Sequence, residues 1–130
     1  SQQEYYAKAD VWPLAPEGEI LVVIQCEDVQ AIENLPSILK EVPGIGVVLI
    51  GEGDLSQELG YPRQYDHPVV ADAINSILAI CKENNVPCGH PHPDTQNTAR
   101  LVEEGYRFLM PGSGRSYTAL DQGRTLTGRE

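Results

Sequence analysis

The chain has 130 residues, of which nine are Lys or Arg and 19 are Asp or Glu, so its formal net charge is −10. An apolar share of 41% is enough for one packed domain and too high for a disordered tail. The acidic balance argues against a nucleic-acid partner, because nucleic-acid-binding surfaces are usually basic. No apolar run approaches the roughly 20 residues of a membrane span, and residues 1–10 carry no signal-peptide pattern. We therefore expect a soluble, cytoplasmic protein without a membrane partner.

The cysteines support the same compartment. Cys26, Cys81 and Cys88 are odd in number and lack CxxC spacing, so we expect free thiols in a reducing environment. We interpret them as packing positions and not as nucleophiles.

Four apolar runs predict buried strands, at residues 20–25, 47–51, 86–89 and 108–110. The first two runs do not alternate with polar residues, and such runs are typical of parallel strands covered on both faces. The third is weaker, because Pro87 interrupts it.

A helical pattern follows the first strand. Apolar residues from Ala31 to Val42 recur at the spacing of one helix face. Pro36 lies inside this stretch and is expected to split it into two short helices.

Later helices carry start and stop signals. His67-Pro68 places proline at a favoured first helical position, and Asn84-Asn85 ends that helix. The next helix is predicted to begin with Asp94 or Thr95 as its N-cap and to stop at Gly105.

With a further helix over residues 113–122, the order is (βα)4. A (β/α)8 TIM barrel has twice as many units in about 250 residues, so the chain is either half a barrel or a small open α/β sheet. No Gly-rich phosphate loop follows the first strand, which favours the half barrel. Four parallel strands leave two open edges, so we expect a homo-oligomer or another partner instead of a lone monomer.

Polar residues at the strand ends are the candidates for chemistry, because α/β barrels carry their sites there. Gln25 and Glu27 end the first strand and share one face, while Cys26 points toward the helices. Asp54 follows the second strand. Adjacent parallel strands lie about 4.8 Å apart, so Glu27 and Asp54 can converge on one point.

Two converging carboxylates have two chemical uses. They can bind a hard divalent cation, or share a proton as an acid–base pair. No cationic residue stands beside them in the sequence, which favours the metal. Spacing alone also leaves open a structural alternative, in which Glu27 caps the following helix and Asp54 makes a turn.

Several motifs in order along the chain together resemble the HpcH/HpaI aldolase family, the class II pyruvate aldolases of the phosphoenolpyruvate/pyruvate barrel superfamily. The resemblance covers residues 19–120. The motifs are Gln25-Cys26-Glu27, Gly51-Glu52-Gly53-Asp54-Leu55-Ser56, Leu59-Gly60-Tyr61 and His67-Pro68.

The resemblance implies strands five to eight of a TIM barrel over residues 19–130, with residues 1–18 as the preceding helix tail and loop. It also implies a Mg²⁺, Mn²⁺ or Co²⁺ ion bound by Glu27 and Asp54. Gln25 would lie beside the bound keto acid as a catalytic residue. The substrate carboxylate would be received by the loop of Gly51, Gly53 and Asp54.

The implied activity is that of a divalent-metal-dependent carbon–carbon lyase, an aldolase or decarboxylase. It would act on a 2-oxo acid of the pyruvate or oxaloacetate type through a metal-stabilised enolate. Two alternatives remain: an acyl-CoA lyase of the same superfamily, and a catalytically incomplete half barrel that only assembles with a partner. In the family the histidine base and an arginine belong to the first half of the barrel, so the partner would be that N-terminal half or a second copy.

Further pocket candidates follow the third and fourth strands. His90 and His92 are potential ligands or acid–base groups, or else part of a rigid proline-set loop. Ser113 and Arg115 lie in a loop that opens a helix; it can receive an anion, or it is simply a tight turn from strand to helix.

Overall fold

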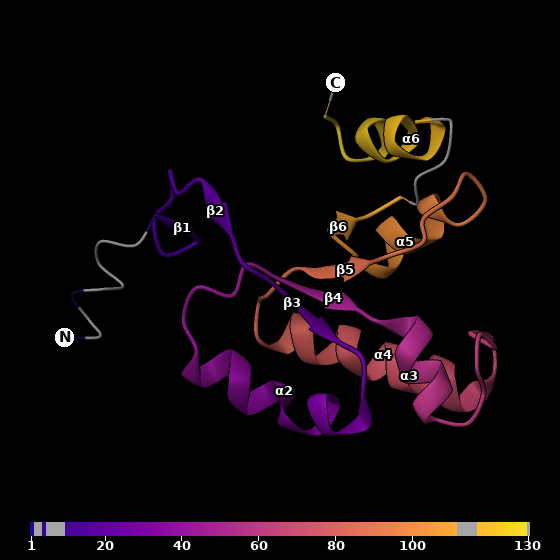
Figure 1. Cartoon of the computed structure of the whole chain (residues 1–130). Coiled ribbons are helices and arrows are strands. Elements are labelled where there is room, and N and C mark those ends of the chain that lie inside the picture. Colours follow the sequence, from indigo (N-terminus) through magenta and orange to yellow (C-terminus); the bar gives the residue numbers. More distant parts are fainter. Residues whose placement is uncertain (2–3, 5–9, 112–116, 130) are drawn as a thin grey trace.

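The structure, a computed structural model, describes Ser1, Glu4 and residues 10–111 and 117–129. Strands β3 to β6 form one parallel sheet in the order β3-β4-β5-β6, and β1 pairs with β2 in a separate parallel ladder (Figure 1). The elements are β1 Val11–Trp12, β2 Ile20–Leu21, β3 Val23–Cys26, α2 Val29–Glu41, β4 Val47–Ile50, α3 Glu52–Glu58, α4 Pro68–Glu83, β5 Cys88–His90, α5 Thr98–Glu104, β6 Phe108–Leu109 and α6 Thr118–Leu126.

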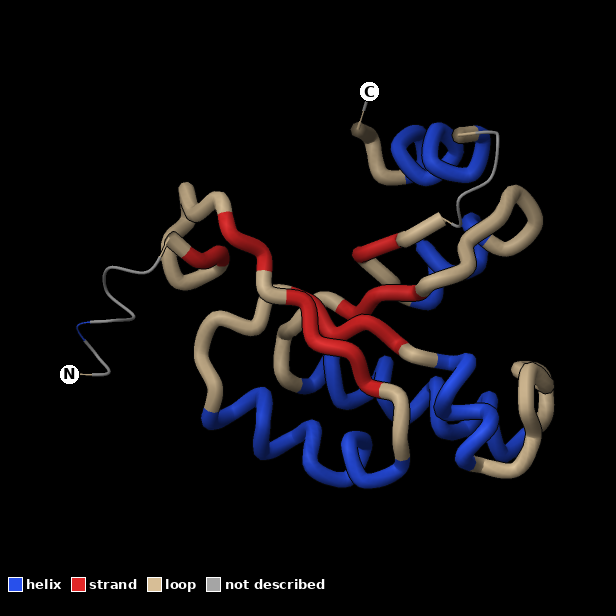
Figure 2. Tube along the Cα trace, in the orientation of Figure 1, coloured by secondary structure: helices blue, strands red, loops and turns tan. Residues whose placement is uncertain are grey.

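Helices α2, α3 and α4 lie along one face of the strands (Figure 2). Every residue of β4 is buried, which confirms the prediction of a strand covered on both faces. Alternation of strands with helices and a parallel sheet were also predicted, and both are found. The fully buried aliphatic and thiol side chains are Cys26, Leu35, Val48, Ile50, Leu55, Val70, Ile77, Cys81 and Leu101.

The first predicted strand, residues 20–25, is divided. Ile20–Leu21 pairs with Val11–Trp12, whereas Val23–Cys26 pairs with β4. Asp10 directs the first part toward β1, because its carbonyl oxygen accepts from the Ile20 N–H at 3.0 Å. A short strand therefore lies inside the predicted N-terminal loop.

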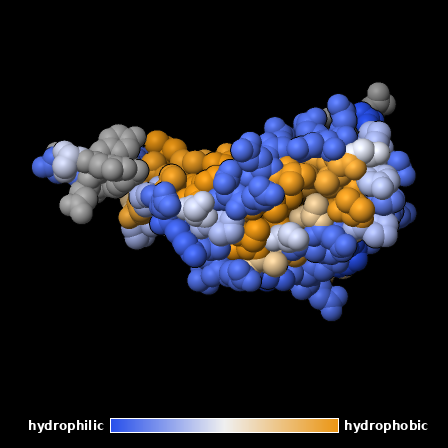
Figure 3. Space-filling model, turned by 90° about the horizontal axis from the view of Figure 1, so that it is seen from below, coloured by the Kyte–Doolittle hydropathy of each residue, from blue (hydrophilic) through white to orange (hydrophobic). Residues whose placement is uncertain are grey.

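This divided strand is also more exposed than predicted. Ile20, Leu21 and Val23 are 53%, 45% and 39% exposed, so coverage on both faces was wrong here. The reason is position, because Ile20 and Leu21 belong to the two-stranded ladder outside the main sheet, and Val23 belongs to β3, an edge of the main sheet. Figure 3 shows apolar residues that gather toward the left of the view and continue along the molecule.

Pro36 does not split its helix, contrary to the prediction. α2 runs unbroken from Val29 to Glu41 with Pro36 inside. The lost hydrogen bond is offset by tertiary packing, since Leu35 is 1% exposed and Ile32 and Leu39 pack against the core.

Helix α4 begins at Pro68 and is capped by Asn84, as predicted. Gly105 ends α5 in a left-handed conformation, φ 107°, also as predicted. The start of α5 was predicted too early, because its N-cap is Asn97. Asp94 instead begins the preceding turn, where its Oδ1 accepts from the Asn97 N–H at 2.9 Å.

Two further differences concern the helices that flank the sheet. Helix α3 was not predicted, although it follows β4 directly. The last helix, α6, runs from Thr118 to Leu126, so its end lies beyond the predicted Gln122. The predicted start at Ser113 falls outside the described residues.

Strands β3 and β6 are the two open edges of the sheet, as expected for four parallel strands. Cys26, Cys81 and Cys88 are free and buried, as predicted. None of the helices in the described part of the chain has the length and apolar character to cross a membrane.

Candidate metal and substrate site

The end of β3 presents Gln25 and Glu27 on one face, as the alternation predicted. The Gln25 Nε2 donates to Glu27 Oε2 at 2.5 Å, so the two side chains lie together. Cys26, between them, is 2% exposed and belongs to the core. Burial raises the pKa of the Cys26 thiol to about 12, which makes it a poor nucleophile, as expected.

Gly51 leaves the space that Glu27 occupies. A Cβ at Gly51 would lie 2.8 Å from Glu27 Oε2 and 3.0 Å from Gln25 Nε2, and it would also clash with the Glu27 Cβ. The glycine therefore lets the Gln25–Glu27 pair extend across the end of β4. Here glycine is required by close approach, since the backbone is not in the left-handed region, with φ −94°.

Asp54 follows Gly51 by three residues and lies in the first turn of α3. Its side chain is exposed. A Cβ at the preceding Gly53 would meet no atom within 4 Å. Gly53 and Asp54 therefore border open space at the carboxyl end of the sheet.

The structural alternative for Glu27 is wrong. Helix α2 is capped by Asp28, whose Oδ1 accepts from the Ala31 N–H at 2.6 Å. Glu58 of α3 accepts from the Val29 N–H at 2.9 Å. Asp28 and Glu58 therefore accept the hydrogen bonds from the first N–H groups of α2, and Glu27 does not cap this helix. Asp54 likewise lies within a helix, not in the turn that the alternative proposed.

The donor set suits a hard divalent cation. Mg²⁺ is typically bound by one or two carboxylates and keeps several water or substrate oxygens, and Glu27, Asp54 and the Gln25 amide offer such oxygens. Within the described residues, no three or more His, Cys, Asp or Glu side chains gather where one metal ion would fit. An ion there would therefore depend on water or substrate for its remaining positions.

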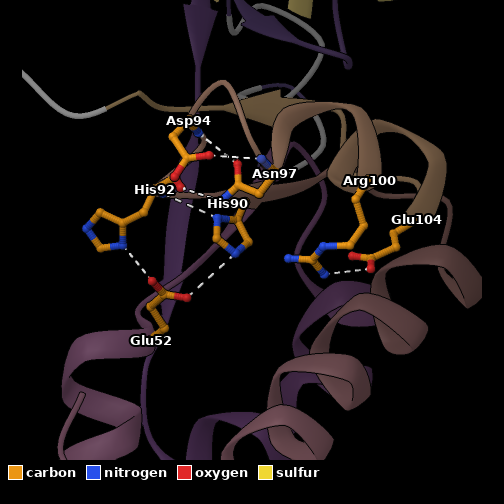
Figure 4. A network of polar contacts seen from close by, with 7 residues as sticks. All are labelled: Glu52, His90, His92, Asp94, Asn97, Arg100 and Glu104. Carbon is orange, nitrogen blue, oxygen red and sulfur yellow. Dashed lines mark hydrogen bonds and ion pairs between the residues drawn. The ribbon is translucent and has the colours of Figure 1, made fainter. Parts of the chain in front are cut away.

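Glu52 forms a second cluster with the two candidate histidines (Figure 4). Its carboxylate is 4% exposed. Oε1 lies 2.6 Å from His92 Nδ1, and Oε2 lies 3.6 Å from His90 Nε2. We call Glu52, His90 and His92 the histidine cluster. The sequence analysis singled out both histidines but not the carboxylate that joins them.

His90 is the buried member of the pair. It ends β5, is 9% exposed and makes an edge contact with Tyr106, with ring centroids 5.2 Å apart. Burial lowers the pKa of His90, although Glu52 acts in the opposite direction. His92 differs, since its side chain is 60% exposed. A cavity of about 200 Å³ adjoins this cluster and is lined by Glu52, His90, Tyr106 and residues of α4 and α5.

The loop that carries His92 is held by its own hydrogen bonds. Its N–H donates to His90 Nδ1 at 3.2 Å, and its carbonyl accepts from Asn97 Nδ2 at 3.1 Å. Pro91 and Pro93 are buried. The predicted proline-set loop is therefore present, and the histidine pair is built into it. Ser113 and Arg115, the remaining pocket candidates, lie outside the described residues.

A parallel α/β sheet with acidic side chains at the carboxyl ends of its strands has the organisation of α/β-barrel enzymes. The sequence profile of the family "HpcH/HpaI aldolase/citrate lyase" matches residues 8–117. The chain belongs to this family, and the predicted resemblance is confirmed.

Named relatives agree with this assignment. The chain is 32% identical over 112 residues to a 4-hydroxy-2-oxo-heptane-1,7-dioate aldolase of Escherichia coli, covering 82% of this chain and 42% of that protein. It is 30% identical over 94 residues to a 5-keto-4-deoxy-D-glucarate aldolase of Salmonella newport, covering 72% and 36%. The chain thus spans less than half the length of these relatives.

A solved structure gives the same result for the fold. The HpcH/HpaI aldolase from Desulfitobacterium hafniense superimposes with a TM-score of 0.68 at 29% identity, over 88% of this chain and 44% of that one.

Proposed function

We propose that this chain is the C-terminal half, strands five to eight, of a divalent-metal-dependent carbon–carbon lyase that acts on a 2-oxo acid. The observation that carries the proposal is the Gln25–Glu27 pair lying over Gly51, directly before the helix that bears Asp54. Family membership and two relatives named as aldolases of oxo acids support the same activity.

Each residue has a part in this reaction. Glu27 and Asp54 would hold Mg²⁺, Mn²⁺ or Co²⁺, which when bound supplies a Lewis acid for charge that develops on the 2-oxo acid. Gln25 orients Glu27 through its amide and borders the substrate. Gly51 leaves room for the Glu27 side chain, and the backbone at Gly53 and Asp54 would receive the substrate carboxylate.

Pyruvate release from oxaloacetate tests this proposal. It is measured for the protein as isolated, with Mg²⁺ and with EDTA, beside a blank that contains the metal alone. An excess over the blank that EDTA removes supports a working site. Loss of that excess in Glu27→Gln, but not in a variant of the exposed Glu33 such as Glu33→Gln, assigns it to the predicted residues. Equal rates in Glu27→Gln and the parent chain would contradict the metal role of Glu27.

A second candidate function is assembly, and the open edges of the sheet favour it. Exposed apolar residues lie on β2, at the β3 edge and near the β6 edge, among them Ile20, Val23 and Met110. A groove of about 540 Å³ between β6, α5 and α6 is lined in part by Phe108 and Leu120. These surfaces fit a complementary four-stranded half that closes an eight-stranded barrel, supplied by an N-terminal half or by a second copy.

Native mass spectrometry tests assembly directly. We expect a mass above that of one chain, either alone or after an N-terminal-half polypeptide of a family member is added. If both samples give a single monomer mass, the assembly proposal fails. If the mixture gains oxaloacetate decarboxylation that neither half has alone, the partner supplies the missing catalytic groups.

A further inference from the structure

Glu52 is the most buried carboxylate among the described residues, and both of its oxygens face imidazoles. A buried carboxylate is costly unless it is paired and hydrogen-bonded. The His92 contact, at 2.6 Å, is the short bond of the cluster, and His90 completes the pairing. The cluster joins the first residue of α3 to the end of β5 and the loop that follows it (Figure 4).

Helix geometry links this cluster to Asp54. Residues two positions apart on an α-helix are rotated by about 200° about the helix axis, so their side chains point in nearly opposite directions. Glu52 is accordingly buried against the histidines while Asp54 is exposed on the other side of the first turn. Fixing Glu52 therefore fixes the rotation of that turn, and with it the direction of the Asp54 side chain.

The two histidines that contact Glu52 are held by backbone hydrogen bonds and packing. His90 belongs to β5 and packs on Tyr106. The Met110 N–H donates to the His90 carbonyl at 3.0 Å. His92 is bonded to His90 and Asn97. In the first turn of α3 the Leu55 N–H donates to the Gly51 carbonyl at 3.0 Å, and the Ser56 Oγ donates to the Gly53 carbonyl at 2.8 Å.

We propose that Glu52 is a positioning residue, which holds the first turn of α3 against the histidine cluster and so sets the direction of the Asp54 side chain. The proposal rests on the proposed metal site for its consequence, but not for the geometry it describes. Neither the charge of Glu52 nor its titration is needed. What matters is the reach of its side chain to His92.

Two substitutions at Glu52 separate the effect of side-chain length from the effect of charge. Glu52→Asp keeps the negative charge and shortens the side chain by one methylene, so it loses the His92 contact. Glu52→Gln removes the charge but keeps the length and an oxygen that can accept from His92. Glu83→Asp, at an exposed carboxylate of α4, is the matched control.

Amide hydrogen exchange of the metal-free chain is the first measurement. In Glu52→Asp we expect the Leu55 amide to exchange about tenfold faster, with α4 and β5 unchanged. Glu52→Gln and Glu83→Asp should stay near the parent rate, and His92→Ala should behave like Glu52→Asp. Unchanged Leu55 exchange in Glu52→Asp overturns the proposal. So does a uniform acceleration through α4 and β5, because that marks a general packing role.

Mn²⁺ affinity, measured by electron paramagnetic resonance, is the second measurement. We expect Glu52→Asp and His92→Ala to bind Mn²⁺ about tenfold more weakly, while Glu52→Gln remains within about threefold of the parent chain. Equal weakening in Glu52→Gln and no change in Glu52→Asp would show an effect of charge and overturn positioning. If the parent chain binds no Mn²⁺, the proposed metal site fails, and Leu55 exchange alone decides the role of Glu52.

Discussion

Two groups of carboxylates lie at the carboxyl end of the parallel sheet, and they differ in what stands beside them. Glu52 is buried between two imidazoles. Glu27 is half-buried with an amide as its neighbour, and Asp54 is exposed. In the described part of the chain, no Lys, Arg or His forms an ion pair with Glu27 or Asp54. Glu52 therefore connects α3 to the end of β5, whereas Glu27 and Asp54 have their negative charge available for a cation from solution.

Removal of the Glu27 carboxylate should have the largest effect on metal binding. Glu27→Gln keeps the shape of the side chain, so we expect the fold to persist. Loss of a ligand should weaken Mn²⁺ binding by at least about 100-fold, more than a change in the residues that surround a metal site. Titration of Mn²⁺ followed by electron paramagnetic resonance measures this, and Glu33→Gln is the control. Similar affinity in both variants would break the contrast between the two groups.

A side chain at position 51 should displace the Gln25–Glu27 pair by steric crowding. Gly51→Ala places a Cβ 2.8 Å from Glu27 Oε2, so the Gln25–Glu27 pair must move. We expect a loss of about 1–3 kcal/mol in the free energy of unfolding, together with weaker Mn²⁺ binding. Urea denaturation and Mn²⁺ titration provide the two values. If both stay at the parent values, Glu27 is free to lie elsewhere, and the close approach to Gly51 has no function.

The histidine cluster should instead show itself in the pH dependence of stability. Burial lowers the pKa of His90, so the folded chain keeps this imidazole neutral at a pH where the unfolded chain protonates it. The unfolded state then binds more protons, and the free energy of unfolding falls as the pH drops through the ordinary histidine range near about 6.5. Urea denaturation at several pH values measures this slope. His90→Gln should have a shallower slope, and an identical slope in both chains would contradict the assignment.

Features with a local signal were predictable from the sequence. Proline at the first turn and Asn84 at the end set the limits of α4, and alternation along β3 placed Gln25 and Glu27 on one face. These signals involve residues close in sequence, whose geometry depends on the backbone alone. The four-stranded parallel order followed from the same kind of pattern.

Features that depend on distant packing were not predictable. Glu52 and His92 are 40 residues apart in sequence, and they meet only because the seven-residue helix α3 turns back at the end of β4. Such a short helix, with Gly53 inside it, has a weak intrinsic signal. The unbroken α2 is similar, because its stability at Pro36 comes from core contacts of Leu35 that the sequence pattern does not weigh against the lost hydrogen bond.

The smallest expected effect comes from the neighbouring glycine, Gly53, and it sharpens the contrast with Gly51. A Cβ at Gly53 meets no protein atom within 4 Å, and this residue lies inside α3. Gly53→Ala should therefore stabilise the chain by about 0.5–1 kcal/mol, because alanine loses less conformational freedom in a helix. Mn²⁺ affinity should not change.

Pyruvate binding tests whether the open space at Gly53 receives the substrate carboxylate. If that space receives the substrate carboxylate, the added methyl group of Gly53→Ala should weaken pyruvate binding to the Mn²⁺-loaded chain while stability rises. Water-proton relaxation of the bound Mn²⁺ reports on this binding. A stabilised variant that binds pyruvate as well as the parent would place the carboxylate elsewhere and leave only the Glu27 side of the site. Opposite changes in stability and pyruvate binding at Gly53, beside joint losses of stability and metal binding at Gly51, would show that one glycine serves the ligand and the other serves Glu27.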